Sequence, residues 1–285
     1  MVSVSTFEEL KEALELAAAN NLETLFLGGG SNLLVSDDGV AKLVIQNKLS
    51  GIKQRGTILT AKSGTSLQEL VNYSIEHGVA GLQKLTGIPG TVGGAIFGNA
   101  GAYGQSISDH LVEVVFFDGD EKVAFNKKQS EFSYRSSIFK TSRLPILEAT
   151  FQFEEGETQV LKEEADKTLS QRLVKYPAGI KCPGSFFKNL IVAELPKGVA
   201  ANIPEDKITF GKITAGYLLE EVGAKGLSRG DIEIAPYHAN LFINKGKGTA
   251  KDFYELAQEV ALKVKEKFGI TLEPEVQLIN LPPLI

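Results

Sequence analysis

The stretch GIPGTVGGAIFGNAGAYGQ, residues 87–105, holds seven glycines and no charged residue. Each glycine in an ordered element costs about 0.5–1 kcal/mol relative to alanine, because its backbone loses more conformational freedom on folding. A run this rich in glycine is therefore costly as plain structure. It becomes useful where the backbone lies flat against a planar or phosphorylated ligand and offers N–H donors without side-chain bulk. The stretch favours a bound cofactor.

A second glycine run, LGGGSNLLV at residues 27–35, follows a predicted strand. It fails as a GxGxxG dinucleotide fingerprint, because such a loop must open a helix, and LLVSDDG at 33–39 is too short and turns too soon. On its own the run is compatible with an ordinary tight turn. Consecutive N–H groups in such a turn also form an anion-binding nest, and two uncharged glycine loops in one lobe favour a cofactor.

Composition limits the class of protein. The 285 residues are 43% hydrophobic and 23% charged, which predicts a soluble globular protein of two or three compact units. The net charge of −5 and the lack of a basic block argue against a nucleic-acid partner. One cysteine, Cys182, excludes an internal disulfide and a cysteine metal cluster and fits a reducing cytoplasm. The acidic, amphipathic start predicts no signal peptide, and no window of roughly 20 apolar residues predicts membrane insertion.

Helix and strand patterns alternate along the chain and predict an α+β protein. Five stretches are predicted to be helical, at 5–21, 67–78, 154–177, 214–223 and 249–269. Apolar residues recur at helical spacing in the first and in the last, which Gly269 ends, whereas 154–177 is predicted to be an exposed, charged helix that ends before Pro177. Capping boxes, Thr6 with Glu9 and Ser66 with Glu69, open the first two of these helices. Alternating residues predict a hairpin at 111–125 that turns at Asp118–Asp120, and strands near 239–244 and 270–280.

Seven motifs occur in the order found in one enzyme family: LGGGSNLLV, GIPGTVGGAIFGNAGAYG, FSYRSSIFK, CPGSFFKN, AGYLLEEVGAKG, HANLFIN and LEPEVQLI. From about Thr6 to Ile279 the chain resembles the UDP-N-acetylenolpyruvoylglucosamine reductases, also called UDP-N-acetylmuramate dehydrogenases. The resemblance implies a cytoplasmic flavoenzyme of bacterial peptidoglycan synthesis, and through the cell wall a part in cell shape and division. The chain lacks an insertion with an extra tyrosine loop and so resembles the shorter subclass.

The resemblance also implies the domain organisation. Residues 1–172 are expected to form an FAD-binding region of the vanillyl-alcohol-oxidase type, with two α/β subdomains at about 1–55 and 56–172. Residues 173–285 are expected to form a C-terminal α+β substrate-binding domain. A monomer is predicted.

The resemblance implies that FAD binds through both glycine runs. Contacts to its pyrophosphate are expected from Gly28, Gly29, Gly30, Ser31, Asn32 and Leu33. Residues expected to line the flavin are Gly87, Pro89, Gly90, Thr91, Gly93, Gly94, Asn99, Gly101 and Ala102. The lobe's histidines, His77 and His110, lie outside both runs, so non-covalent FAD is expected.

The resemblance implies a reaction in two steps. NADPH reduces FAD and leaves, and UDP-N-acetylglucosamine enolpyruvate then takes a hydride at its terminal carbon. Arg135 matches the family's arginine, whose planar fork suits a carboxylate or enolate oxygen. Ser185 matches the proton donor, and Glu275 the group that assists protonation. Glu273 lies two residues earlier on the same predicted strand, so spacing does not choose between the two glutamates, and the family match favours Glu275.

Expected substrate contacts are Tyr134, Arg172, Lys175, Asn189 and His238. For Arg172 and Lys175 the alternative is a solvated helix end, and for His238 a capping or packing role. No metal site is predicted.

Two other functions stay open from the sequence. One is a flavin oxidase acting on an alcohol or sugar, which rapid reoxidation by oxygen and indifference to NADPH would favour. The other is a nucleotide-sugar-binding or regulatory protein without turnover. The joint presence of Arg135, Ser185 and Glu275 argues against the second.

Overall fold

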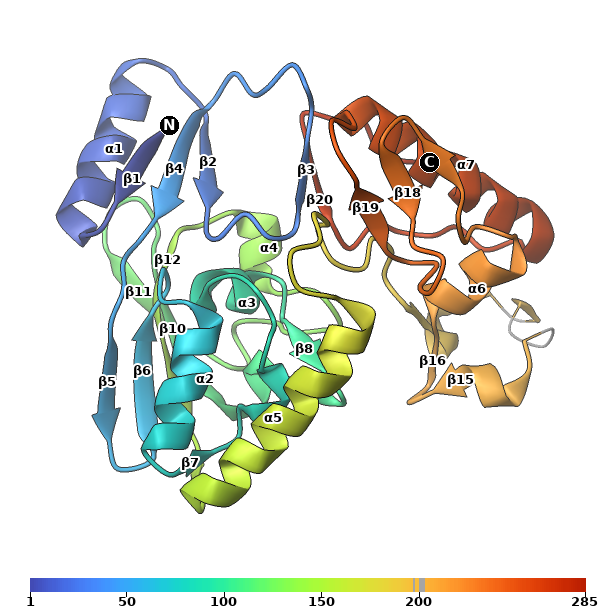
Figure 1. Ribbon diagram of the computed structural model, residues 1–285. Coiled ribbons are helices and arrows are strands. Elements are labelled where there is room, and N and C mark those ends of the chain that lie inside the picture. The colour runs from blue at the N-terminus through green and yellow to red at the C-terminus, as the bar shows by residue number, and fades with distance from the viewer. Residues whose placement is uncertain (197, 200–202) are drawn as a thin grey trace. The chain divides into compact units, whose positions relative to one another are not determined.

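The computed structural model describes residues 1–196, 198–199 and 203–285 and divides into two compact units (Figure 1). Unit 1 comprises Met1–Gly30 and Ala41–Arg172, and unit 2 comprises Ser31–Val40 and Leu173–Ile285. The chain therefore passes between the units after Gly30, after Val40 and after Arg172. The segment Ser31–Val40 departs from the expected division of the chain, because its strand pairs inside unit 2.

Unit 1 begins with a parallel sheet in the order β1-β4-β2, formed by β1 (Val2–Val4), β4 (Leu43–Asn47) and β2 (Thr24–Leu27). Helix α1 (Phe7–Ala19) lies beside this sheet (Figure 1). The Thr6 hydroxyl accepts from the Glu9 N–H, and the Glu9 carboxylate accepts from the Ser5 N–H. The predicted start of this helix is confirmed, and its Leu10 and Ala13 pack with Ile45 of the sheet in a small core.

The larger sheet of unit 1 is antiparallel, in the order β11-β10-β12-β6-β5. Its strands are β5 (Ile52–Arg55), β6 (Ile58–Lys62), β10 (Leu111–Phe117), β11 (Lys122–Asn126) and β12 (Ile146–Gln152). The predicted hairpin joins β10 to β11, and the Asp118 carboxylate accepts the N–H groups of Asp120 and Glu121 in its turn. This sheet supplies much of the largest core in unit 1.

Four helices belong to this part of the chain: α2 (Leu67–Glu76), α3 (Val92–Phe97), α4 (Ile138–Ser142) and α5 (Thr158–Lys175). Two short pairs complete it, β7 (Val79–Ala80) with β13 (Glu154–Glu155) and β8 (Gly101–Ala102) with β9 (Gln105–Ser106). The predicted capping box at Ser66 is wrong. Ser66 does precede α2, but its side chain makes no capping bond, and the residue forms a β-bridge with Thr91 instead.

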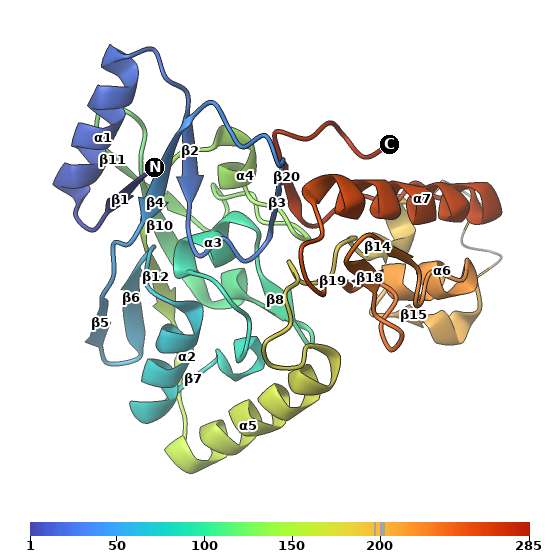
Figure 2. The same cartoon turned by 45° about the horizontal axis from the view of Figure 1, so that its top comes forward.

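The described residues of unit 2 form three small sheets. They are β3 (Leu33–Val35) parallel to β20 (Gln277–Ile279), then β14 (Leu190–Ile191) with β16 (Lys212–Ile213) and β15 (Ile208–Thr209), and finally β17 (Ser228–Arg229) with β18 (Ile232–Ile234) and β19 (Phe242–Asn244). Helix α6 (Ala215–Glu221) and helix α7 (Ala250–Phe268) pack with these strands around one core (Figure 2).

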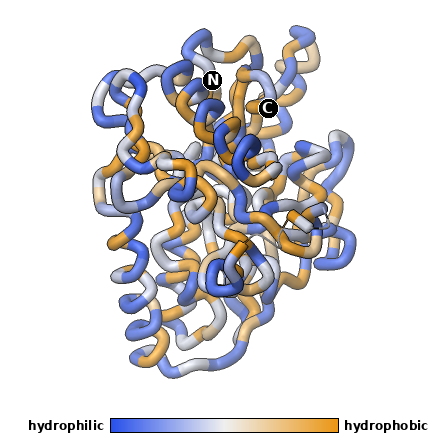
Figure 3. The backbone as a smooth tube through the Cα atoms, turned by 90° about the vertical axis from the view of Figure 1, so that its right-hand side faces the viewer, coloured by the Kyte–Doolittle hydropathy of each residue, from blue (hydrophilic) through white to orange (hydrophobic). Residues whose placement is uncertain are grey.

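Helix α7 follows its predicted pattern. Thr249 and Asp252 form a reciprocal capping box at its start, and Gly269 ends it in the left-handed region at φ 69°. Its predicted apolar stripe is buried at Phe253 and Leu256, among others. Hydrophobic and hydrophilic residues alternate along the backbone in Figure 3, and no helix in the described ranges is long and apolar enough to cross a bilayer.

Candidate active site

In unit 1 the two glycine runs pack directly against each other. A Cβ atom on Gly29 would lie 3.0 Å from the Gly90 Cα, and a Cβ on Gly28 would lie 2.6 Å from the Thr91 Oγ1. Both distances are shorter than ordinary van der Waals contact, so a side chain on Gly29 would push the two backbones apart and one on Gly28 would displace the Thr91 side chain. Thr91 caps α3 by accepting from the Gly94 N–H. Residues far apart in the sequence thus form one backbone-rich surface.

Asn99 lies within the second glycine run, just after α3, and is 7% exposed. Its Nδ2 donates to the Ser133 carbonyl at 2.8 Å, while its Oδ1 is buried without a hydrogen-bond partner. Its backbone adopts φ 43°, in the region that non-glycine residues rarely occupy. A buried acceptor without a partner costs free energy, so the Asn99 Oδ1 is suited to receive a hydrogen bond from a ligand.

Tyr134 and Arg135 form the tip of a tight turn. Ser133 and Ser136 exchange N–H···O=C bonds across it, and Arg135 adopts φ 56°. The turn is fastened to the second glycine run, because Asn99 binds the Ser133 carbonyl and the Ser137 hydroxyl donates to the Phe97 carbonyl. The backbone of the predicted cation is therefore fixed beside the residues expected to line the flavin.

Arg172 lies near the end of α5 and beside the second glycine run. A Cβ on Gly87 would lie 3.2 Å from the Arg172 Nε and 3.1 Å from the Leu169 Cδ1. The Gly87 N–H donates to the Gln68 side chain. Gly87 thus leaves room for α5 at this point, and the structure brings Arg172 to the glycine run that sequence spacing alone did not connect with it.

In unit 2 the backbone around Ser185 is held from both sides. Ser185 forms an antiparallel β-bridge with Leu241, and the Glu275 N–H donates to the Phe186 carbonyl at 2.7 Å. The side chain of Asn240, which is 2% exposed, forms two hydrogen bonds with the backbone of Phe187. Its Oδ1 accepts from the Phe187 N–H and its Nδ2 donates to the Phe187 carbonyl. These bonds bring Ser185 and Glu275 onto adjacent segments.

The two glutamates of LEPEV differ in their partners. The Glu273 carboxylate forms a 2.8 Å ion pair with the Lys188 ammonium, and the Glu273 carbonyl accepts from the Lys188 N–H. Glu275 lies opposite Phe186, the residue that follows Ser185. The Glu273 side chain is thus engaged with Lys188, while the backbone of Glu275 is bonded to the residue that follows Ser185.

Ser31, Asn32 and Leu33 belong to unit 2, although the motif that contains them starts in unit 1. The Asn32 Nδ2 donates to the Glu275 carbonyl at 3.2 Å, and the Gln277 N–H donates to the Asn32 carbonyl. The same segment supplies β3, the parallel partner of β20. The end of the first glycine run therefore supports the segment that carries Glu275.

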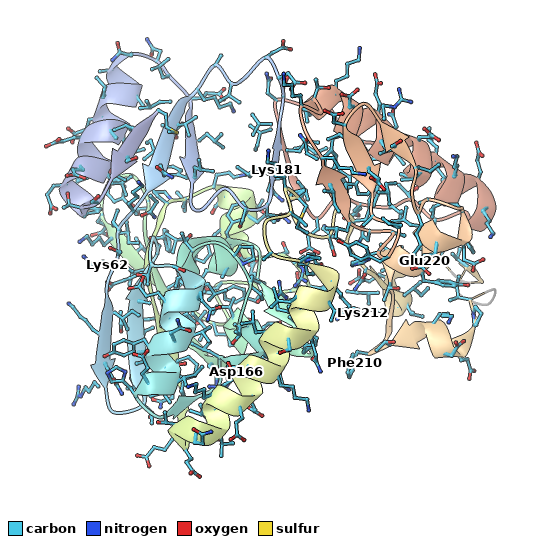
Figure 4. The ribbon with its side chains drawn as sticks, in the orientation of Figure 1. Lys62, Asp166, Lys181, Phe210, Lys212 and Glu220 are labelled. Atoms are coloured by element: carbon cyan, nitrogen blue, oxygen red, sulfur yellow. The ribbon has the colours of Figure 1, made fainter. Side chains whose placement is uncertain are left out.

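The remaining predicted substrate contacts also lie in unit 2. The Asn189 Oδ1 accepts from the Ala215 N–H at the start of α6. Burial lowers the pKa of His238, and the positive charge of Lys175 lowers it further, so His238 is favoured as a neutral donor or acceptor. The negative charge of Glu220, which is labelled in Figure 4, raises the pKa of His238 and so opposes these two effects. Glu220 also forms an ion pair with Lys225.

Sequence reasoning missed two residues of this region. Asn240 fixes the backbone beside Ser185, and the Tyr176 hydroxyl lies 2.8 Å from the Ser185 Oγ. The pattern offered one signal for Asn240, an amide side chain at the start of an apolar strand. Cys182 lies in the same loop, and burial raises the pKa of its thiol, which disfavours a nucleophilic role.

The comparisons with known proteins agree along the chain. The family model described as FAD binding domain matches residues 1–124, and the one described as UDP-N-acetylenolpyruvoylglucosamine reductase, C-terminal domain, matches residues 176–279. The reductase of Solibacter usitatus is 41% identical over 94% of this chain and 86% of its own length. The chain belongs to the UDP-N-acetylenolpyruvoylglucosamine reductase family.

Further relatives support this assignment. UDP-N-acetylenolpyruvoylglucosamine reductase 2 of Bacillus cereus is 34% identical over 98% of this chain and 86% of its own length. The crystal structure of the family's enzyme from Thermus caldophilus covers 98% of this chain and 91% of its own, with a TM-score of 0.77 and 31% identity. The expected family and the α+β fold, an FAD-binding region followed by the family's C-terminal domain, are confirmed.

The residues of unit 1 fit FAD. The glycine runs offer backbone N–H groups without side chains, which suits a pyrophosphate, and the buried Asn99 Oδ1 suits an N–H or O–H donor of the cofactor. The family model for an FAD binding domain covers both runs. FAD is therefore the cofactor that this unit supports.

Proposed function

We propose that the protein is an NADPH-dependent flavoenzyme that reduces the enolpyruvyl group of UDP-N-acetylglucosamine enolpyruvate to give UDP-N-acetylmuramate in peptidoglycan synthesis. The observation that carries the proposal is the 41% identity to a named reductase over 94% of the chain. The anchored positions of Arg135, Ser185 and Glu275 support it, since these three residues match the family's catalytic groups.

The proposed cofactor is FAD, bound without a covalent link and held by the Gly28–Leu33 and Gly87–Ala102 segments. When bound, FAD supplies the two-electron chemistry that joins oxidation of NADPH to reduction of the substrate. The backbone contact between Gly29 and Gly90 holds the two segments together.

The three catalytic residues have separate proposed roles. Arg135 binds the substrate carboxylate and stabilises the negative charge that develops toward it, because a planar guanidinium matches two oxygen atoms. Ser185 holds, on its Oγ, the proton that the neighbouring substrate carbon receives. Glu275 assists this protonation. A serine hydroxyl is a weak acid, so its position relative to the basic carbon decides whether it can act.

The proposed substrate contacts are Tyr134, Arg172, Lys175, Asn189 and His238. Arg172 and Lys175 supply positive charge suited to a diphosphate, and a neutral His238 suits a hydrogen bond to an uncharged group. We propose a cytoplasmic monomer, as expected from the sequence.

The test is to follow NADPH oxidation by the flavin-loaded protein with and without UDP-N-acetylglucosamine enolpyruvate. The proposal predicts oxidation that depends on this substrate and yields UDP-N-acetylmuramate. NADPH oxidation at the same rate with and without the substrate would indicate an oxidase. Reduced flavin that reacts rapidly with oxygen and not with the enolpyruvyl group would indicate the same. Purified protein that binds the nucleotide sugar without turnover would indicate a binding protein.

A further inference from the structure

We propose that Tyr176 is a positioning residue that orients the Ser185 hydroxyl for proton donation. The inference rests on the proposed function of Ser185. Its basis is the 2.8 Å contact between the Tyr176 phenol oxygen and the Ser185 Oγ, within unit 2. This distance is typical of a strong O–H···O hydrogen bond.

The backbone of Ser185 is already fixed by its neighbours, so only its side-chain rotation remains to be set. The bridge to Leu241 and the clamp of Asn240 on Phe187 hold the segment, and Phe186 and Phe187 are buried. A serine side chain still has three staggered rotamers and a freely turning O–H bond. The Tyr176 hydroxyl is the group that selects among them.

The chemistry fixes the direction of the hydrogen bond. A hydroxyl donates one hydrogen and accepts through two lone pairs. If the Ser185 proton goes to the substrate carbon, the bond between the two hydroxyls must run from the Tyr176 O–H to the Ser185 Oγ. In this direction Tyr176 also stabilises the negative charge that develops on the Ser185 oxygen as its proton leaves.

The position of Tyr176 is itself supported. Its ring lies edge-on to the His238 ring with centroids 6.1 Å apart. The loop between Tyr176 and Ser185 is tied down where the Lys181 carbonyl accepts from the Asn244 N–H at 2.9 Å, and Lys181 is labelled in Figure 4. Tyr176 directly precedes Pro177, and proline restricts the backbone of the residue before it.

The experiment compares Tyr176→Phe with the parent enzyme in separate half-reactions under anaerobic conditions. We expect reoxidation of the reduced flavin by UDP-N-acetylglucosamine enolpyruvate to slow about tenfold in its limiting rate constant, as for the loss of one hydrogen bond to a charged group. The substrate concentration at half-maximal rate and the reduction by NADPH should stay unchanged. The control is Tyr254→Phe, which removes the hydroxyl that donates to the Pro283 carbonyl in the same unit; it should leave both half-reactions unchanged.

Two further readouts separate orientation from plain structural support. In a Ser185→Ala background, Tyr176→Phe should cause no additional loss, whereas a structural role would produce the same loss in both backgrounds. A crystal structure of the Tyr176→Phe variant should show the Ser185 hydroxyl spread over more than one rotamer. A single unchanged rotamer, or tenfold losses in both backgrounds, would overturn the inference.

The outcomes also distinguish this inference from the proposed function. Normal turnover by Ser185→Ala would refute the proton-donor role and with it the inference. If Ser185→Ala loses the reoxidation of flavin by the substrate while Tyr176→Phe keeps full activity, only the role of Tyr176 is overturned.

Discussion

The two halves of the Leu27–Val35 motif differ in what they support. The first half, Gly28–Gly30, belongs to unit 1, where Gly29 lies against the Gly90 backbone of the second glycine run. The second half, Ser31–Val35, belongs to unit 2, where it pairs with β20 and binds the Glu275 carbonyl. One contiguous motif thus joins the expected cofactor surface to the segment that carries a proposed catalytic glutamate.

The Leu27–Val35 motif is uninformative when it is considered alone, because its residues serve contacts with distant parts of the chain. Gly29 must be a glycine because the backbone of Gly90, more than 50 residues later in the chain, packs against it. Asn32 donates a hydrogen bond to the carbonyl of Glu275, 243 positions away. Both requirements come from tertiary contacts. A short sequence pattern therefore predicts that something approaches closely, without identifying the partner.

The largest expected effect is that of Gly29→Val, which adds a side chain in the first half of the motif. The new Cβ would meet the Gly90 Cα at 3.0 Å, so the two backbones must separate, at a cost of about 1–3 kcal/mol. Purified protein should have lost its flavin, measured by absorbance after denaturation.

The matched control for that change is Gly216→Ala in α6, where the added Cβ has no neighbour closer than 3.7 Å. It should keep full flavin and gain a little stability, because alanine favours a helix over glycine. Full flavin occupancy in Gly29→Val would contradict the role assigned to the first half.

The next effect concerns the anchor that follows the motif. The Asp37 carboxylate accepts from the N–H groups of Ala250 and Lys251 at the start of α7. Asp37→Ala should lower the free energy of unfolding by about 1–2 kcal/mol, through loss of a charged helix cap, while flavin content is unchanged. Urea unfolding measures this. Asp38→Ala, an exposed neighbour, serves as the control, and equal losses in both variants would remove Asp37 as an anchor.

A smaller effect is expected for Asn32→Ala. This variant distinguishes two roles of Asn32, as a proposed FAD contact and as the donor to the Glu275 carbonyl. Loss of its bond to the Glu275 carbonyl should cost about 1 kcal/mol of stability and slow the reoxidation of reduced flavin by substrate. Flavin occupancy should stay high, since backbone N–H groups remain. Flavin titration checks this, and a protein without flavin would assign the Asn32 amide directly to the cofactor.

The smallest effect concerns pH and unit 2. The pKa of the partly buried His238 is lowered from its ordinary value of 6.5, so the unfolded chain takes up this proton first as the pH falls. His238 therefore reduces stability below about pH 6.5 and has no such effect above it. His238→Gln should lose less unfolding free energy on acidification than the parent protein. An identical pH dependence in urea unfolding would show that His238 does not contribute.

Much of the local structure was predictable, because its causes are local. The cap at Thr6, the αL glycine at Gly269 and the turn after β10 all depend on residues within a few positions of one another. The failure at Ser66 shows the limit of the same rules, since a tertiary bridge to Thr91 competes with the helix cap.

The site was predictable only in part. The motifs identified Arg135, Ser185 and Glu275 through family resemblance, and their roles remain predictions. The Tyr176–Ser185 bond and the Asn240 clamp depend on how a loop and a distant strand meet, with 53 positions between Asn240 and Phe187. The ion pair of Glu273 with Lys188 spans 85 positions, so spacing could not distinguish Glu273 from Glu275.

The proposed reaction passes electrons from flavin to an enolpyruvyl group, with Ser185 as the proton donor. The most direct measurement is anaerobic mixing of the NADPH-reduced protein with UDP-N-acetylglucosamine enolpyruvate while the oxidised-flavin absorbance is followed. We expect rapid return of that absorbance in the parent protein and almost none in Ser185→Ala, although NADPH reduces the flavin of both. Reduced flavin that is not reoxidised by this substrate in the parent protein would contradict the proposed reaction.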